Sequence, residues 1–347
     1  MKICICGGGN IAHSLAAVLS RANDVSVLTR RPLEWAAHLR CEQGLDHTLL
    51  PNGRSVFRTD DRCVLSDAEC VIVALPRFVI REVMPSLMDF MRLGQTIVFI
   101  PAPAGMETIV GKLSARGIDT IGFQRVPFVA RIIEYGKAIW ISAVRDIHKL
   151  AFSDRKHVAE WKKFFEGSFG GKVECLSSFL SFTFSNSNPL LHPPRLAVLL
   201  KGGRNGEYVD CPRFYADWTD ESSELYVAAD REMFTTFNAY SPEAAKHDYE
   251  SALAHYGVDN TIALTQKIRS IDSLKPILAP WEKCEGGIWK PDLKSRYFTE
   301  DVPYGTEIIQ EYADQAGIDT PVIDSLITTI KSWMIKGSNC ASEIVNQ

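Results

Sequence analysis

Hydrophobic residues in the first half of the chain form short, uninterrupted runs, and amphipathic segments separate them. Such runs predict β-strands, and the run at residues 70–75 is typical of a strand buried on both faces of a parallel sheet. The predicted strands cover residues 3–6, 25–28, 70–75, 96–100, 119–123, 137–144 and 171–175. Helical segments are predicted at residues 13–19, 79–91 and 157–166. This alternation predicts an α/β fold with an N-terminal Rossmann-type, doubly wound parallel sheet.

The strand pattern stops near residue 181, and longer helical patterns take its place. They cover residues 222–240, 241–255, 306–316 and 321–336. Pro242 and Pro321 each follow a Ser or a Thr, which is typical of the first turn of a helix. We therefore expect a Rossmann-type domain over residues 1–180 and a mostly α-helical domain over residues 181–347.

A glycine-rich turn follows the first predicted strand and precedes the first predicted helix. Its spacing, Gly7-x-Gly9-x-x-Ala12, is the dinucleotide-binding fingerprint with alanine as the third small residue. Gly7 allows the sharp turn, Gly9 lets the backbone approach a pyrophosphate, and Ala12 lets the helix pack closely on the strand. We expect this turn, with Asn10 and Ile11 at the helix N-terminus, to bind the phosphates. A glycine-rich connection without a ligand is the alternative.

The end of the second predicted strand indicates which dinucleotide the turn would take. In this fold an acid there binds the ribose of NAD, whereas an arginine accommodates the 2′-phosphate of NADP. Arg30 and Arg31 occupy this position, and the nearest following acid is Glu34. We therefore expect NADP, with NAD as the alternative cofactor; a solvated basic turn is the other interpretation. Since ligands collect at strand ends, we also expect the cofactor to contact Leu75, Pro76 and Pro101.

Composition narrows the class of protein. The 347 residues are 46% hydrophobic and 23% charged, with a net charge of −4, which gives no support for nucleic-acid or membrane-surface binding. No hydrophobic run approaches the length of a membrane span, and the first strand leaves no room for a signal peptide. The nine cysteines form neither a Cys-x-x-Cys nor a Cys/His array. We therefore expect reduced thiols, a cytoplasmic location and no metal.

Two stretches of the second half resemble the octopine/nopaline (opine) dehydrogenase family. The first, Asn186-Ser-Asn188-Pro-Leu-Leu-His192-Pro, is similar to the family's Asn-Pro…His-Pro motif at the start of its helical domain. The second, residues 296–305 (Arg-Tyr-Phe-Thr-Glu-Asp-Val-Pro-Tyr-Gly), closely matches the family's Arg-Tyr-x-x-Glu-Asp-x-Pro-x-Gly stretch. Residues 317–324 are similar as well, so with the glycine turn the resemblance spans most of the chain.

The resemblance implies a reductive condensation of an amino acid with a 2-oxo acid. The amine and the carbonyl form an imine, and NAD(P)H delivers hydride to its carbon. In this family a histidine of the helical domain acts as general acid/base beside an aspartate, and the motifs place these roles on His192 and Asp301. The family's arginine, which holds a substrate carboxylate, corresponds to Arg296. Asn186 and Asn188 either bind substrate or make an Asx-turn before the following proline.

The residue types themselves suit this chemistry. Histidine titrates near neutral pH, so it can both give and take a proton in one cycle. A carboxylate on its other ring nitrogen fixes the tautomer, and a guanidinium binds a carboxylate through two parallel hydrogen bonds. The sequence does not show whether His192 and Asp301 meet. A loop histidine, a turn or cap aspartate and a surface Arg296 are the plain alternatives.

Two other functions are consistent with the same two-domain plan. One is a ketopantoate reductase or a 3-hydroxyacid dehydrogenase, which normally use a lysine of the second domain for catalysis, and Lys201 is a candidate for it. The other is a non-catalytic NADP-binding sensor that signals through its helical domain. Helical second domains often pair, so a homodimer is one expectation, with the oligomeric state left open. The identity of the two substrates is open too.

Overall fold

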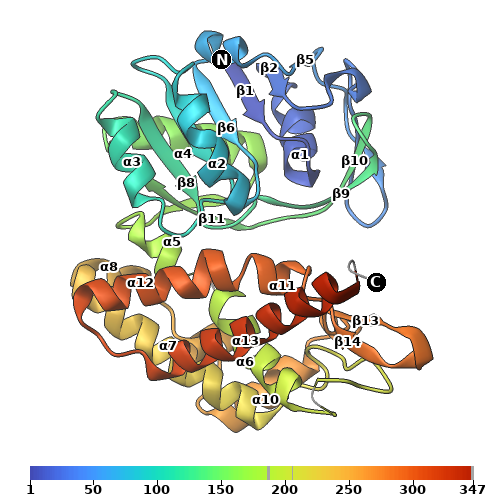
Figure 1. Ribbon diagram of the computed structural model, residues 1–347. Helices are drawn as coiled ribbons and strands as arrows, with labels where there is room; N and C mark the ends of the chain where they lie inside the picture. The colour runs from blue at the N-terminus through green and yellow to red at the C-terminus, as the bar shows by residue number, and fades with distance from the viewer. Residues whose placement is uncertain (186–187, 205, 345–347) are drawn as a thin grey trace. The chain divides into compact units, whose positions relative to one another are not determined.

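The computed structural model describes residues 1–185, 188–204 and 206–344, and the chain divides into two compact units (Figure 1). Unit 1 covers Met1–Phe182 and unit 2 covers Thr183–Gln347. The division falls two residues after the boundary expected from the sequence. Within the described residues, no helix combines the length and the apolar content needed to cross a bilayer.

Unit 1 is built on an eight-stranded sheet with the strand order β12-β11-β8-β7-β6-β1-β2-β5. Six neighbouring strands run parallel: β5 (Phe57–Thr59), β2 (Asp24–Leu28), β1 (Lys2–Cys6), β6 (Cys70–Val73), β7 (Thr96–Phe99) and β8 (Asp119–Phe123). The order reverses between β1 and β6, which is the switch point where doubly wound sheets bind dinucleotides. The expected fold class is therefore confirmed. The sheet ends in β11 (Ile147–Phe152), which is antiparallel to β8, and β12 (Lys172–Cys175).

Alternate residues of β1 point to the two faces of this sheet, and each face has its own core. Ile3 and Ile5 pack in one hydrophobic cluster with residues of α1 (Asn10–Leu19) and α4 (Val158–Phe169). Cys4 and Cys6 pack in the other cluster with residues of α2 (Arg77–Met88) and α3 (Glu107–Ser114). Helices on both faces explain why the strands carry the uninterrupted apolar runs seen in the sequence.

A second, four-stranded sheet with the order β4-β3-β10-β9 packs against α1. It consists of β3 (Arg40–Gln43), β4 (Thr48–Leu49), β9 (Phe128–Glu134) and β10 (Ala138–Val144). The sequence predicted a strand at β10 but not its partner β9, in which buried Phe128 and Ala130 alternate with exposed Val129 and Arg131. β9 therefore presents one apolar face only, and it joins this smaller sheet rather than the parallel one.

Unit 2 is mostly helical, and α7 (Asp220–Tyr240) is its central element, since α6, α8, α10, α12 and α13 all contact it. The side chain of Glu232 on α7 accepts hydrogen bonds from the N–H groups of Val322 and Ile323, both at 2.9 Å, and thereby caps α13. The helices are α5 (Leu180–Phe184), α6 (Asn188–Lys201), α8 (Pro242–Asp248), α9 (Ala252–Tyr256), α10 (Thr261–Ser270), α11 (Arg296–Thr299), α12 (Glu307–Ala316) and α13 (Pro321–Ile344). Short helical turns are η1 (Pro32–Glu34), η2 (Arg62–Asp67), η3 (Glu285–Gly287) and η4 (Val302–Thr306).

Unit 2 contains helices that the sequence prediction lacks, among them α6 and α10, and it differs from that prediction in two further respects. The segment at 241–255 is not one helix but two, because Ser251 caps α9 by accepting from the N–H of Ala254, and Asp230 accepts from the N–H of Ala252 at 2.9 Å. A two-stranded hairpin of β13 (Trp281–Lys283) and β14 (Trp289–Pro291) also follows the point where strands were expected to stop. Each strand has three residues, too few for a readable alternation.

Candidate active site

The turn after β1 has the geometry of a dinucleotide-binding turn. Gly7 has a φ of +148°, and a Cβ there would lie 2.5 Å from the carbonyl oxygen of Ala74, just after β6. Gly9 is the N-cap of α1, and no heavy atom lies within 4 Å of the place that its Cβ would take. The first N–H groups of a helix have no hydrogen-bond partner within the helix. Because the space beside Gly9 is open, a phosphate can approach these N–H groups and accept their hydrogen bonds. The residues present therefore fit the pyrophosphate of a dinucleotide.

The other predicted residues of this turn divide between packing and anchoring. Ala12 is fully buried against the sheet, and Ile11 packs partly buried against the same core. The side-chain oxygen of Asn10 accepts a hydrogen bond from the N–H of Ile132 in β9 at 2.8 Å. Asn10 thus ties the second sheet to the glycine turn, and its contact with a cofactor stays a prediction.

His13 on α1 makes a second connection between the turn and that sheet, and sequence reasoning missed it. Its Nε2 accepts from the N–H of Gly136 at 2.8 Å, so its Nδ1 carries the proton and donates to the carbonyl of Gly9 at 2.9 Å. The ring packs on Trp35 with centroids 4.0 Å apart. Burial lowers the pKa of His13, which favours this neutral form. The sequence carried no signal for this role beyond a histidine one turn into the helix.

The two predicted arginines lie exposed after β2. The guanidinium of Arg31 stands over the ring of Tyr135, 3.9 Å from its centroid, and its Nη1 lies 3.3 Å from Glu34. The Tyr135 hydroxyl in turn lies 2.8 Å from the Cβ position of Gly8 in the glycine turn. Through Tyr135, Arg31 therefore lies beside this turn, as a 2′-phosphate site requires, although Glu34 offsets part of its charge. Tyr135 is a residue that sequence reasoning missed.

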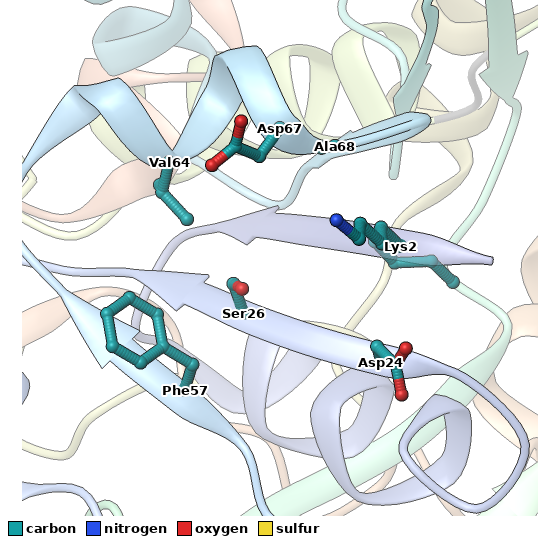
Figure 2. A pocket seen from close by; sticks show the side chains of 8 residues that line it. Lys2, Asp24, Ser26, Phe57, Val64, Asp67 and Ala68 are labelled. Atoms are coloured by element: carbon teal, nitrogen blue, oxygen red, sulfur yellow. The ribbon is translucent and has the colours of Figure 1, made fainter.

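Leu75, Pro76 and Pro101 follow the carboxyl ends of β6 and β7, which are the next strands after β1 in the sheet. A cavity of about 250 Å³ lies instead at the amino ends, where Lys2 begins β1 and Asp24 begins β2 (Figure 2). Its lining consists of Lys2, Ile3, Asp24, Ser26, Phe57, Val64, Asp67 and Ala68. Because open α/β sheets bind ligands at their carboxyl ends, we assign no cofactor to this cavity.

In unit 2, His192 and Asp301 are in direct contact. Nδ1 of His192 lies 2.7 Å from Oδ2 of Asp301, and the two residues are only 3% and 8% exposed. A carboxylate only accepts hydrogen bonds, so Nδ1 carries the ring proton and Nε2 is the nitrogen that can accept one. This is the orientation that a His–Asp pair needs for general acid/base catalysis.

The contact depends on how two helical segments meet. Pro193 has no N–H, so the carbonyl of Pro189, four residues earlier in α6, receives no helical hydrogen bond from it. The hydroxyl of Thr306 donates to that carbonyl instead, at 2.6 Å. The N–H of Thr306 donates to the carbonyl of Asp301 at 3.0 Å, which fixes Asp301 at the start of η4 beside α6. Thr306 is a third residue that sequence reasoning missed.

Two tyrosines surround the same histidine. The hydroxyl of Tyr215 lies 3.0 Å from Nε2 of His192, and Tyr215 is 7% exposed. The ring of Tyr297 packs on the imidazole with centroids 4.4 Å apart. Burial raises the pKa of both phenols, so both stay protonated at neutral pH. The only signal for Tyr297 was its place in the 296–305 stretch, and Tyr215 had none.

Arg195 lies one turn after His192 on α6 and is only 2% exposed. Its Nε donates to the carbonyl of Phe214 at 3.0 Å, and Nη2 donates to that of Arg213 at 3.4 Å. Burial lowers its pKa to about 10, so the guanidinium remains charged at neutral pH. It holds the backbone that leads into Tyr215.

The remaining predicted residues lie around this pair. Arg296 begins α11 and is exposed, and among the described side chains no carboxylate forms an ion pair with it. Asn188 begins α6, one turn before His192, while Asn186 lies outside the described residues. Lys201 is exposed at the end of α6, roughly 13 Å along the axis from His192 at about 1.5 Å per residue. The lysine is therefore not part of the His192 cluster.

Comparison with known proteins finds similar dinucleotide-dependent oxidoreductases. Residues 175–334 match the model of the NAD/NADP octopine/nopaline dehydrogenase α-helical domain, and residues 2–103 match that of a coenzyme F420-dependent NADP oxidoreductase. The tauropine dehydrogenase of Arabella iricolor is 23% identical over 96% of this chain and 91% of its own. The octopine dehydrogenase of Pecten maximus is 26% identical over 94% and 88%.

Solved structures show the same fold. Octopine dehydrogenase in complex with NADH and L-arginine superposes with a TM-score of 0.83 at 22% identity, over 96% of this chain and 89% of that one. A ketopantoate reductase from Ralstonia eutropha JMP134 superposes with a TM-score of 0.64 at 14% identity, over 97% and 99%. The two-domain plan is thus common to both classes of enzyme, and the arrangement of side chains has to distinguish them.

Proposed function

The chain belongs to the octopine/nopaline (opine) dehydrogenase family, and from this premise we propose that it reductively condenses an amino acid with a 2-oxo acid. It is an NAD(P)-dependent oxidoreductase that acts on CH–NH groups. The observation that supports the proposed chemistry most strongly is the buried hydrogen bond between His192 and Asp301. A ketopantoate reductase normally uses a lysine of the second domain, and the candidate for it, Lys201, lies at the far end of the helix from His192.

His192 is the proposed general acid/base. It takes a proton from the ammonium group of the amino acid, which makes the amine nucleophilic, and later returns one to the oxygen that leaves as water. Asp301 stabilises the imidazolium that forms between these steps. Arg296 binds the carboxylate of the 2-oxo acid, and Asn188 is a further substrate contact. The bound dinucleotide supplies the hydride that reduces the C=N bond.

For the cofactor we propose a preference for NADP over NAD. Arg30 and Arg31 lie exposed beside the glycine turn, and Tyr135 supports the second of them. The cofactor contacts proposed for Gly7, Gly9, Asn10, Ile11, Ala12, Leu75, Pro76 and Pro101 complete the site. Replacement of both arginines by Ala should raise the Kd of NADPH at least 10-fold and leave that of NADH within about 2-fold, because only the 2′-phosphate interaction is lost. Equal effects on the two cofactors would contradict the preference.

Compartment and assembly are part of the same proposal. The eight cysteines whose side chains the structure describes are free thiols, which supports a reducing, cytoplasmic location. We also propose a homodimer, the commonest closed assembly, and sedimentation equilibrium of the purified chain at several concentrations tests this directly.

The direct test of the function is a screen of NADPH consumption. Amino acids are crossed with pyruvate, 2-oxoglutarate and glyoxylate, and each pair is repeated with His192→Ala and Lys201→Ala. We expect oxidation that requires both substrates, is lost in His192→Ala and persists in Lys201→Ala. Oxidation by a 2-oxo acid alone, with loss in Lys201→Ala, would instead identify a carbonyl reductase. Tight NADPH binding without turnover of any pair would identify a sensor.

A further inference from the structure

The proton-transfer nitrogen of His192 already has a partner in the structure. Since Nδ1 donates to Asp301, Nε2 accepts, and the hydroxyl of Tyr215 at 3.0 Å is its donor. Three groups therefore form one hydrogen-bonded chain, from the carboxylate through the imidazole to the phenol. All three residues are at most 8% exposed. A substrate can reach Nε2 only if Tyr215 moves aside or if Tyr215 itself transfers the proton.

The surroundings of Tyr215 favour proton transfer over movement. Arg195 holds the carbonyls of the two preceding residues, and the N–H of Phe214 donates to the carbonyl of Ile277 at 2.8 Å. The Tyr215 ring is parallel to that of Trp218 within 7°, and Trp218 is itself fully buried with its Nε1 donating to Ser223 at 2.9 Å. Swinging the phenol away would disrupt this aromatic packing while its backbone stays fixed.

We propose that Tyr215 is a catalytic residue that carries protons between the substrates and His192. This inference rests on the proposed function, because it assumes that His192 is the general acid/base. Burial raises the pKa of Tyr215, so the phenol does not stand as a phenolate between steps. It must receive one proton as it gives up another, and the chain of hydrogen bonds allows this.

Each proton is accounted for in the relay. The substrate ammonium gives a proton to the phenol oxygen of Tyr215 while the phenol gives its own to Nε2, which leaves a neutral amine and an imidazolium beside Asp301. The amine lone pair forms the C–N bond, and the carbonyl π electrons move to oxygen. A second nitrogen proton then moves to that oxygen within the adduct. Finally Tyr215 protonates the hydroxyl, which departs as water with the C–O electrons while the nitrogen lone pair forms the C=N bond, and Nε2 returns its proton to Tyr215.

The test is Tyr215→Phe, which keeps the ring and removes only the relay hydroxyl. We expect kcat to fall about 100-fold or more, as for loss of a general acid/base, with both substrate KM values within about 3-fold of wild type. His192→Ala combined with Tyr215→Phe should be no slower than His192→Ala alone, because the two groups act as one unit. The matched control is Tyr208→Phe. In the wild type the Tyr208 hydroxyl donates to the carbonyl of Leu199 at 2.7 Å, and Leu199 lies on α6 as His192 does. We expect the kcat of Tyr208→Phe to equal that of wild type.

Unchanged or raised kcat in Tyr215→Phe would overturn the relay, because a hydroxyl that merely covers Nε2 would free it on removal. In that case His192→Ala remains inactive, so the proposed function stands without the relay. Failure of the proposed function is recognised differently, by wild-type protein that turns over no pair of substrates or by a fully active His192→Ala. A separate measurement, ¹⁵N NMR of histidine-labelled protein, tests the hydrogen bond between the Tyr215 hydroxyl and Nε2 of His192. Tyr215→Phe should shift the Nε2 resonance of His192, and an unmoved resonance overturns the inference.

Discussion

Asp301→Asn isolates the charge of the buried His192–Asp301 pair, because the amide has nearly the shape of the carboxylate. The wild-type carboxylate accepts from Nδ1 at 2.7 Å and would stabilise the imidazolium during the reaction. The asparagine has no charge to offer, and its NH2 group can turn toward the ring and reverse the tautomer. The perturbation therefore acts on the protonated form of His192 while substrate binding is left intact.

The size of the effect follows from burial. For opposite charges about 4 Å apart, the interaction is about 1 kcal/mol in water but about 4 kcal/mol at the effective dielectric constant near 20 that applies in proteins. His192 and Asp301 are 3% and 8% exposed, so the larger value applies to them. A loss of about 4 kcal/mol from the transition state lowers kcat by about 1,000-fold, whereas a solvated pair would lose only about 5-fold.

The assay is steady-state NADPH oxidation with saturating amino acid and 2-oxo acid, beside thermal unfolding of each variant. Asp324→Asn is the matched control, because Asp324 accepts hydrogen bonds from Gln310 and Thr320 at the start of α13, outside the His192 cluster. It should retain kcat even where it lowers Tm. If a folded Asp301→Asn protein retained more than about a tenth of the wild-type kcat, the charge of Asp301 would not serve the reaction.

Three further predictions concern the other parts of the site. Arg296→Lys should raise the KM of the 2-oxo acid about 10-fold with little change in kcat, because lysine cannot form the second parallel hydrogen bond, worth about 1.5 kcal/mol. Gly9→Ala should keep the Tm of the free protein, since its Cβ meets nothing within 4 Å, but weaken NADPH binding more than 10-fold by titration; Gly167→Ala, equally open, should leave it unchanged. Burial lowers the pKa of His13 in the folded protein below its ordinary value of 6.5. The stability that neutral His13 contributes to the fold is therefore complete above pH 6.5 and is lost as the pH falls through the lowered pKa. The unfolding free energy of wild type should exceed that of His13→Phe by more at pH 8 than at pH 5, and a pH-independent difference in denaturant titrations would contradict a neutral His13.

Features encoded within a few neighbouring residues were predictable. The strand, glycine turn and helix at the N-terminus follow one another directly, so hydrophobic pattern and glycine spacing were enough to define them. The central parallel strands β6 and β7 were equally clear, because burial on both faces makes each of them a continuous apolar run, whereas the exposed edge strand β5 (Phe57–Thr59) has no such run and was missed. The resemblance to a family then added His192, Arg296 and Asp301, and no local pattern encodes the contact between His192 and Asp301.

Contacts between distant segments were not predictable in the same way. His13 and Gly136 are 123 positions apart, and His13 alone looks like any histidine on an apolar helix. Its role depends on the turn between β9 and β10, and β9 was missed because its alternation of buried and exposed residues covers only four positions and breaks at two consecutive isoleucines. Tyr215 is a similar case, since its partner on α6 lies 23 positions earlier and no motif surrounds it. One sequence records the residues of such pairs but not their pairing.

At the prolines beside His192, helix propensity predicts a loop where the structure has a helix, yet the physical reason for that low propensity also explains the contact that forms there. Pro193 and Pro194 favour a loop by propensity, yet both lie within α6. Proline disfavours a helix partly because it leaves a carbonyl without its donor, and here Thr306 supplies a donor to Pro189 from 117 positions away. The same residue fixes the carbonyl of Asp301, so the defect that proline creates in the helix becomes the place where the carboxylate segment docks. The His-Pro motif and the Asp-x-Pro stretch are therefore two halves of one interface, which explains why they must occur together for His192 to be oriented.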